Sequence, residues 1–374
     1  RRSDQWSVGE CRRRLDGAVS KAKAKPKPIS LALQGGGALG AYTWGALDRL
    51  LEDERIAIKA VSGSSAGAMC AVVLADGFRE GGAEGARAKL RQFWESIARE
   101  GRSNPYRRTP MMAFLNAFKP GWAPESYLAM WADMASRWAS PYDFNPLNVN
   151  PLKEVLEEMV DFERVRACDI QLFIGATNVE TGRIRIFKNA ELSADHVMAS
   201  ACLPQLFQAV TIDGAPYWDG GYTGNPALFP LFGVEATRDI VIVQINPLER
   251  PGAPRSPVEI TARVAEINFN ANLLSELRAI EFVGRMLDQQ MLPSKRYRKM
   301  LVHNVSEGTA LTPLGLGVDL NTDIGFFNKL FETGRAAADQ WLDQHFDALG
   351  QRSTVDLAAM FRDEPAPGEA KPLR

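Results

Sequence analysis

Cysteine and histidine are scarce in this sequence of 374 residues, which holds four of the former and three of the latter. The cysteines stand at 11, 70, 168 and 202, without the paired spacing of a zinc site or a disulfide framework. We therefore expect a reducing, cytoplasmic compartment, with no metal and no other cofactor.

Strong net charge and long apolar runs are lacking too. The formal net charge of −1 gives no electrostatic case for nucleic acid as a partner. No apolar run approaches the roughly 18–20 residues that a membrane span requires. Basic residues gather in residues 1–28, and the Lys-Pro-rich run Lys21–Pro28 indicates a flexible tail. Its alternative is peripheral contact with an anionic membrane, where each basic residue gains about 1 kcal/mol.

Strand and helix patterns alternate after this tail. Ile29–Leu33 and Ile56–Ser62 predict buried strands, and Ala38–Glu54 and Ala66–Asp76 predict the helices that follow them. This order predicts an α/β fold with a mostly parallel sheet and right-handed crossovers. Further strands are predicted at 173–177, 183–187, 209–212, 216–218, 240–245 and 300–305, and helices at 257–291 and 322–349.

The predicted organisation has one catalytic domain, over 29–247, and a C-terminal helical extension packed on it, over 248–350. Flexible tails are expected at 1–28 and 351–374. A helical insert is expected at about 89–160, and within it residues 105–138 are rich in aromatic residues and methionine. Such a stretch is typical of plain core, or alternatively of a lid or lipid-facing cap.

A nucleophile motif follows the second predicted strand. Gly63-Ser64-Ser65-Ala66-Gly67 has the G-x-S-x-G spacing that exposes a serine hydroxyl on a tight strand-to-helix turn. Gly63 and Gly67 flank the serine because side chains there would clash in so tight a turn. Ser65 is therefore the candidate nucleophile. A serine hydroxyl needs an adjacent base and a site for the developing negative charge.

The glycines Gly35, Gly36 and Gly37 follow the first strand and precede a helix, so their N–H groups can form an oxyanion hole. A nucleotide-binding turn is the rival interpretation, because Gly35, Gly37 and Gly40 fit G-x-G-x-x-G. The acidic residue expected at the end of the second strand is missing, and this weakens that alternative.

Asp219 is the candidate general base, in the turn Asp219-Gly220-Gly221. Burial beside Tyr217 and Trp218 would raise the pKa of its carboxyl toward a useful value. The alternative is that these residues merely form a turn. The hairpin signal Asp213-Gly214 delivers Asp219 at the end of the hairpin's second strand.

A histidine-assisted triad stays open as a second arrangement, since Ser65, Asp219 and either His303 or His345 have the order Ser…Asp…His. His303 lies in a predicted strand and His345 in the closing helix, where structural histidines are commoner. His196 precedes the turn at 199–203 and could approach the site. We expect His303→Ala and His345→Ala to keep near-normal activity.

Taken together, these motifs resemble the patatin-like phospholipase family over roughly residues 29–247. The matching stretches are Gly35–Gly40, Gly63–Gly67, Ala199–Pro204 leading to Phe207, Ile212–Gly214, Asp219–Gly221 and Asn225-Pro226. The resemblance implies a three-layer α/β/α fold, a Ser–Asp dyad without histidine and hydrolysis of lipid acyl esters. The family loop often carries Arg or Lys where this chain has Leu39, which weakens the case for contact there with an anionic headgroup.

The expected function is a phospholipase A or lysophospholipase, with a lipid or other acyl ester as substrate. An esterase acting on storage polyesters or acyl-thioesters is a near alternative, because specificity depends on pocket shape. A catalytically silent lipid-binding protein is an alternative from another class, and a nucleotide-binding protein is a third.

Overall fold

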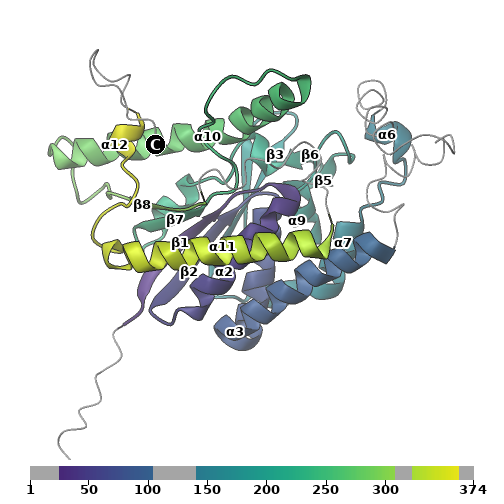
Figure 1. Cartoon of the computed structure of the whole chain (residues 1–374), viewed down its shortest axis with the longest axis horizontal. Helices are drawn as coiled ribbons and strands as arrows, with labels where there is room; N and C mark the ends of the chain where they lie inside the picture. Colours follow the sequence, from purple (N-terminus) through teal and green to yellow (C-terminus); the bar gives the residue numbers. More distant parts are fainter. Residues whose placement is uncertain (1–24, 104–139, 308–321, 362–374) are drawn as a thin grey trace, which may run out of the picture.

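An eight-stranded sheet organises the part of the chain that the computed structural model describes, residues 25–103, 140–307 and 322–361 (Figure 1). Its strands are β1 Lys27–Leu33, β2 Ile56–Gly63, β3 Gln171–Asn178, β4 Ile184–Lys188, β5 Val210–Ile212, β6 Ala215–Asp219, β7 Asp239–Val243 and β8 Leu301–Val305. Their order is β5-β6-β3-β2-β1-β7-β8, and β4 pairs with β3 off this path. The pairings from β3 through β2, β1 and β7 to β8 are parallel, and those of β4, β5 and β6 are antiparallel. The predicted mostly parallel α/β fold is confirmed.

Helices follow most strands. They are α2 Gly40–Glu52, α3 Ala66–Ser103, α6 Pro141–Phe144, α7 Pro151–Met159, α8 Phe162–Arg166, α9 Ala194–Ser200, α10 Pro257–Asp288, α11 Ile324–His345 and α12 Leu357–Met360. Short 3-10 turns are η1 Gly37–Leu39, η3 Asn189–Glu191, η4 Gly220–Tyr222, η5 Phe229–Gly233 and η7 Phe346–Ala348. The stretch at 105–138, a predicted core or cap, lies outside the described residues.

The sheet has an apolar core on each face, because successive side chains of a strand point to opposite sides. In β7, Val241 and Val243 join one core cluster, and Ile240 and Ile242 join the other. The first cluster contains apolar residues of α2, α3 and α11, and the second those of α10 and α12. The result is three layers, helix on sheet on helix.

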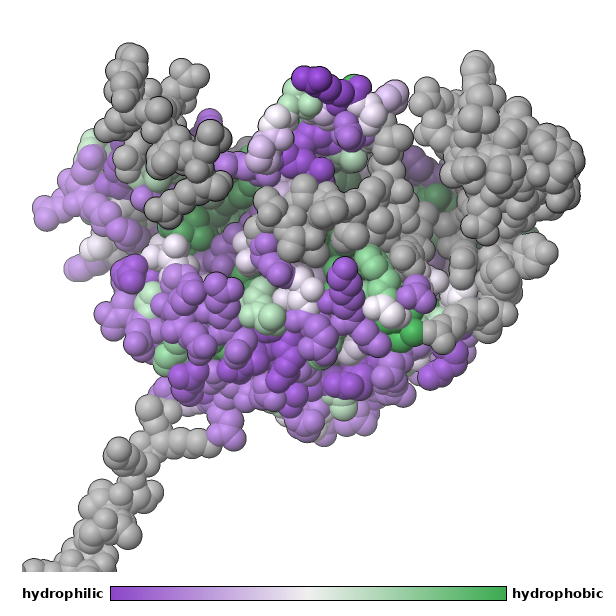
Figure 2. Space-filling model, viewed as in Figure 1, coloured by the Kyte–Doolittle hydropathy of each residue, from purple (hydrophilic) through white to green (hydrophobic). Residues whose placement is uncertain are grey.

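Helices α2 and α11 cross unusually closely over the first core. A Cβ atom on Gly45 would overlap the carbonyl group of Phe331, and one on Gly334 would overlap the carbonyl of Tyr42. Because Gly45 of α2 and Gly334 of α11 have no side chains, the backbones of the two helices come into contact where they cross. Figure 1 shows α11 in front of α2, and the surface on this side is mainly hydrophilic (Figure 2).

The structure corrects three predicted boundaries. β1 begins at Lys27, whose ammonium group donates to the carbonyls of Phe346 (3.0 Å) and Leu349 (3.2 Å), so the strand takes two residues from the expected tail. α3 runs from 66 to 103 with a break at Gly81 and Gly82, instead of ending at 76. Residues 351–361, expected in a flexible tail, pack against β8 and carry α12.

Candidate active site

Three loops meet at the carboxyl edge of the parallel strands. Leu33 of β1 lies opposite Gly63 of β2, and Gly35 and Ser65 each follow two residues later. Gly63 in turn lies opposite Ile174 of β3. Two residues beyond Ile174, Ala176 pairs with Asp219 of the antiparallel strand β6. The sheet register thus places Asp219 at the same edge, and at the same level, as the turn that carries Ser65.

Ser65 has a left-handed backbone conformation, with φ of 54°. This conformation costs a residue that has a Cβ atom about 1–2 kcal/mol, so the surroundings must hold it in place. The Ser65 N–H donates to both the carbonyl (3.1 Å) and the hydroxyl (3.0 Å) of Ser200 at the end of α9. The Ser200 hydroxyl itself donates to the Gly175 carbonyl at 2.6 Å, which ties the turn to β3.

The glycines of the two loops allow them to touch. A Cβ atom on Gly35 would lie 2.6 Å from the Ser65 Cβ and 2.8 Å from the Ser64 carbonyl. One on Gly63 would lie 2.6 Å from the Gly67 carbonyl, and one on Gly67 would overlap the carbonyl of Leu33. Each glycine is therefore required by the close approach of the backbone, and the glycine loop lies directly against the nucleophile turn.

Asp219 is buried, with 1% of its surface exposed. Its Oδ1 accepts the N–H of Gly221 at 2.7 Å, and its Oδ2 has no hydrogen-bond partner among the described residues. Burial raises the pKa of the Asp219 carboxyl from 3.8 to about 6, against smaller lowering effects of the Gly221 N–H and the Ser65 side chain. An unpartnered buried carboxylate oxygen beside a serine is able to accept a proton near neutral pH.

The turn after Asp219 is packed as tightly as the other two loops. A Cβ atom on Gly220 would overlap the Gly175 carbonyl, and one on Gly221 would overlap the Phe269 ring of α10. The Thr177 hydroxyl donates to the Asp219 carbonyl at 2.8 Å, and the Asp219 N–H donates to the Cys202 carbonyl at 2.8 Å. Backbone and side-chain bonds thus hold the carboxylate in one position.

The glycine loop departs from the prediction at one of its three residues. The N–H of Gly35 donates to Oδ1 of Asn225 at 2.6 Å, so it is not free to serve as an oxyanion donor. The expectation for Gly35 is therefore wrong in that respect, and its role is the close approach to Ser65. In the part of the chain that the structure describes, the N–H groups of Gly36 and Gly37 have no hydrogen-bond acceptor, and neither has that of Ala66, the first residue of α3. These amides remain available at the amino end of a helix.

The histidines are engaged elsewhere. Nε2 of His303 pairs with Oδ1 of Asp239 at 3.0 Å, and its Nδ1 pairs with the Thr354 hydroxyl at 3.2 Å. Asp239 begins β7, which runs parallel to β1, so this cluster extends toward the edge opposite Ser65.

His196 bonds the Ser193 hydroxyl through Nδ1 at 2.8 Å and lies edge-on to Phe187, with ring centroids 4.6 Å apart. His345 packs near Trp341. No hydrogen bond joins any of the three histidines to Ser65 or Asp219.

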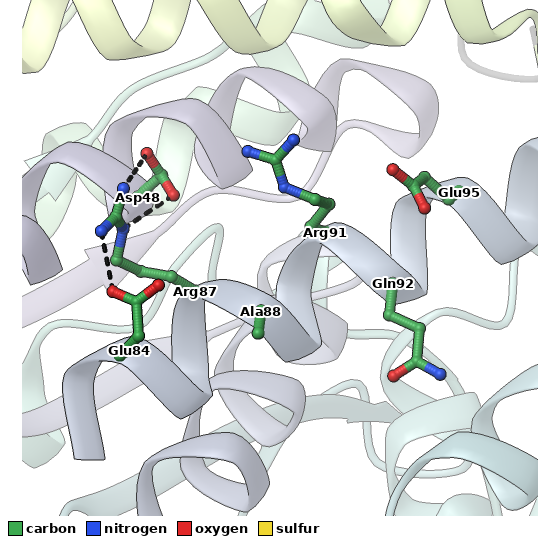
Figure 3. A pocket seen from close by; sticks show the side chains of 7 residues that line it. All are labelled: Asp48, Glu84, Arg87, Ala88, Arg91, Gln92 and Glu95. Atoms are coloured by element: carbon green, nitrogen blue, oxygen red, sulfur yellow. Dashed lines mark hydrogen bonds and ion pairs between the residues drawn. The ribbon is translucent and has the colours of Figure 1, made fainter. Parts of the chain in front are cut away.

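A separate pocket of about 230 Å³ lies between α2 and α3 (Figure 3). Its charged lining is explained by ion pairs, since the buried Asp48 accepts from Arg87 at 3.0 Å and also from Arg335, and Arg87 pairs with Glu84. None of the candidate site residues lines it. We therefore assign it to the packing of α2, α3 and α11.

Two further observations concern metal ligands and membrane-spanning helices. Within the described ranges, no three or more His, Cys, Asp or Glu side chains are grouped so that they could hold a metal ion. None of the helices in that part of the chain has both the length and the apolar character that crossing a membrane demands.

Several residues that shape the site were missed by the sequence reasoning. Gln34, Asn246 and Asn270 form hydrogen bonds behind the glycine loop, and Ser200 holds the Ser65 amide. Gln34 directly precedes the glycines, but a glutamine at a strand end carries no specific signal. Asn270 is 235 residues from the loop, and nothing in its local sequence indicates the contact.

An α/β sheet that brings a serine on a tight turn, a buried carboxylate and backbone amides to one edge is typical of ester hydrolases. A model of the patatin-like phospholipase family matches residues 31–232, more than half of the chain. The chain therefore belongs to the patatin-like phospholipase family and is a lipid ester hydrolase. A search of the curated proteins found no match.

Solved structures give weaker similarities. VipD from Legionella pneumophila is 18% identical, with a TM-score of 0.40 over 86% of this chain and 67% of that one. The ExoU–SpcU complex from Pseudomonas aeruginosa is also 18% identical, with a TM-score of 0.28 over 86% of this chain and 61% of that one. The chain thus spans less than two thirds of the length of this second structure.

Proposed function

We propose that this protein cleaves carboxylic esters of lipids, as a phospholipase A or lysophospholipase, through a Ser65–Asp219 dyad. The observation that carries the proposal is the buried Oδ2 of Asp219, which has no hydrogen-bond partner within the described ranges and belongs to a residue at the same level of the sheet as the strained Ser65 turn. A carboxylate without a partner is costly to bury. Its burial beside a serine supports a catalytic role rather than a structural one.

In the first half-reaction, the Ser65 hydroxyl oxygen attacks the ester carbonyl carbon while Asp219 accepts the hydroxyl proton. The amides of Gly36 and Gly37, with that of Ala66, stabilise the resulting oxyanion, each such donor being worth about 10²–10³ in turnover. The tetrahedral intermediate then collapses and expels the alcohol, which takes the proton from Asp219. An acyl-enzyme on Ser65 remains.

In the second half-reaction, water attacks the acyl-enzyme and Asp219 accepts a proton from it. Collapse of the second tetrahedral intermediate releases the fatty acid and returns the proton to Ser65. Because Asp219 acts as base and then acid in each half, its pKa of about 6 suits both roles near neutral pH.

The test is Ser65→Ala, assayed for hydrolysis of a panel of phospholipids, lysophospholipids and short acyl esters, and for labelling by a fluorophosphonate. We expect both hydrolysis and labelling to disappear while the melting temperature stays close to that of the wild type. Ser64→Ala is the matched control for a neighbouring hydroxyl, since Ser64 donates to the Gly224 carbonyl at 2.6 Å and has no role in the reaction. Activity that survives in Ser65→Ala would remove Ser65 from the mechanism, and an unlabelled wild type would favour a silent lipid-binding protein.

A further inference from the structure

Helix α10 lies wholly beyond residue 232, where the family match ends, yet it contacts both the turn after Asp219 and the residue that precedes the glycine loop. The Phe269 ring occupies the space beside Gly221, next to the candidate base. The Asn272 side chain donates to the Tyr222 carbonyl at 3.2 Å. These contacts reach the turn that carries Asp219.

A further contact reaches the residue that precedes the glycine loop. Asn270 is buried, with 2% of its surface exposed, and its Oδ1 accepts the side-chain N–H of Gln34 at 3.2 Å. Gln34 is the residue immediately before Gly35. Its Oε1 accepts the N–H groups of Ile245 and Asn246, both at 2.8 Å, so the amide group is held at both ends.

A second connection runs through Asn225. Its Oδ1 accepts the Gly35 N–H at 2.6 Å, and its carbonyl accepts the Gln34 side chain at 3.3 Å. The following segment is held by Glu276 of α10, whose carboxylate accepts the N–H groups of Leu228 (2.8 Å) and Phe229 (2.7 Å). Helix α10 therefore holds both partners of the glycine loop, Gln34 and the 225–229 segment.

We propose that α10 is a positioning element of the oxyanion site, and that Asn270, acting through Gln34, fixes the direction of the Gly36 and Gly37 amides. This inference depends on the proposed acyl-hydrolase function. A fully buried chain of amide hydrogen bonds has few alternative arrangements, because any change leaves a buried polar group unpaired. Displacement of oxyanion donors by even a fraction of an ångström lowers the rate with no loss of ground-state binding.

The test compares Asn270→Leu with Asn268→Leu, since Asn268 is exposed on the same helix and its side chain has no hydrogen bond to any residue that the structure describes. We expect Asn270→Leu to lower kcat roughly tenfold, less than the loss of a whole oxyanion donor, with KM unchanged. The inhibition constant of a trifluoromethyl ketone, which forms an oxyanion on the serine, should rise by the same factor. Asn268→Leu should match the wild type in all three quantities.

A double-mutant cycle separates positioning from general destabilisation. Gln34→Met should lower kcat at least as much as Asn270→Leu, because it also removes the bonds to the Ile245 and Asn246 amides. The double variant should lose no more than Gln34→Met alone, because Asn270 acts through Gln34. Asn270→Asp keeps the acceptor for Gln34 but loses the donor to the Pro247 carbonyl (3.0 Å), so it should recover part of kcat. If Asn270→Leu does not fold, Asn270→Ser replaces it, because its shorter side chain leaves Gln34 without an acceptor.

Hydrogen exchange gives a readout that needs no activity. The amides of Gly35, Ile245 and Asn246 should exchange faster in Asn270→Leu than in the wild type, and at the wild-type rate in Ser65→Ala. A failure of the proposed function would abolish the kinetic effects and leave this exchange effect in place. Unchanged exchange in Asn270→Leu, an unchanged kcat in an active enzyme, or multiplicative losses in the cycle would each overturn the inference.

Discussion

Replacing Asp219 with asparagine should abolish hydrolysis and at the same time stabilise the fold at neutral and alkaline pH. The carboxylate is buried, and one of its oxygens has no hydrogen-bond partner among the described residues. Its pKa in the folded chain is about 6, compared with an ordinary value of 3.8, and burial is the main cause. Above that pH, folding therefore has to bury a poorly compensated negative charge.

The size of the effect follows from the two pKa values. A rise from 3.8 to about 6 corresponds to about 3 kcal/mol, at 1.36 kcal/mol for each pH unit. The folded state binds the proton more tightly than the unfolded state, so stability falls as pH rises between these values. The cost is absent below about pH 4, close to half at about pH 5, and complete above about pH 6.

Asparagine removes the charge and keeps an acceptor for the Gly221 N–H. Its amide group must find an acceptor such as the Ser65 hydroxyl, which offsets part of the gain by about 1–2 kcal/mol where the fit is poor. We therefore expect Asp219→Asn to raise the free energy of unfolding by about 1–3 kcal/mol at high pH.

Urea denaturation of both proteins at about pH 8 and about pH 5 measures this difference, and the gain should shrink as the pH falls. Asp213→Asn is the matched control, since Asp213 is exposed in the hairpin turn that leads to β6. It should change stability little, and equally at the two pH values. A variant at residue 219 that is less stable than the wild type at high pH, or whose gain does not depend on pH, would refute the reasoning.

Three other predictions concern the base, the histidine and the helix crossing. The logarithm of kcat/KM should rise with pH and level off above about 6, because only ionised Asp219 accepts the Ser65 proton; a profile that is flat through this range would contradict its role. His303→Ala should keep near-normal activity per folded molecule but lose about 2–3 kcal/mol of stability in urea, since it removes the ring partner of the Thr354 hydroxyl and one of the donors to Oδ1 of Asp239, which also accepts the Gly350 N–H. A loss of activity by several orders of magnitude would instead favour a triad. Gly334→Ala should lower the free energy of unfolding by about 1–3 kcal/mol or more, because its Cβ would overlap the Tyr42 carbonyl. In calorimetry, Gly233→Ala, where a Cβ meets nothing within 4 Å, should unfold near the wild-type temperature.

Those parts of the fold that depend on local patterns could be predicted from the sequence. The apolar runs of β1 and β2, each followed by glycines and a helix, predicted two parallel strands with loops at one edge. The extent of α3 could not be predicted, because residues 77–88 contain several glycines and its helical path is broken at Gly81 and Gly82. The defined structure of residues 351–361 depends on contacts with β8, a strand about 50 residues earlier in the chain. No local sequence pattern predicts these contacts.

The candidate site also has parts that follow from local sequence and parts that depend on distant residues. Ser65 and its flanking glycines form a local motif, whereas the use of the Gly35 amide by Asn225 depends on a residue 190 positions away. A run of three glycines indicates that N–H groups are exposed, but not which of them another side chain will occupy. The correction at Gly35 and the unforeseen role of Asn270 therefore have one cause, the long-range polar contacts behind the loop.

Asp219 lies between these two cases, because a turn that is visible in the local sequence sets the place of its side chain relative to the distant Ser65. Asp213 and Gly214 both have positive φ, 52° and 80°, and they close a two-residue hairpin in which Ile212 pairs with Ala215. This turn sets the register of β6, since primed two-residue turns match the twist of the strands and leave no freedom to slip. A slip of one residue would direct the Asp219 side chain to the opposite face of the sheet and bring Trp218 to the nucleophile instead. The Asp-Gly turn is therefore as necessary to the placement of the carboxylate as the D-G-G motif itself, although it lies six residues before the base and touches no substrate.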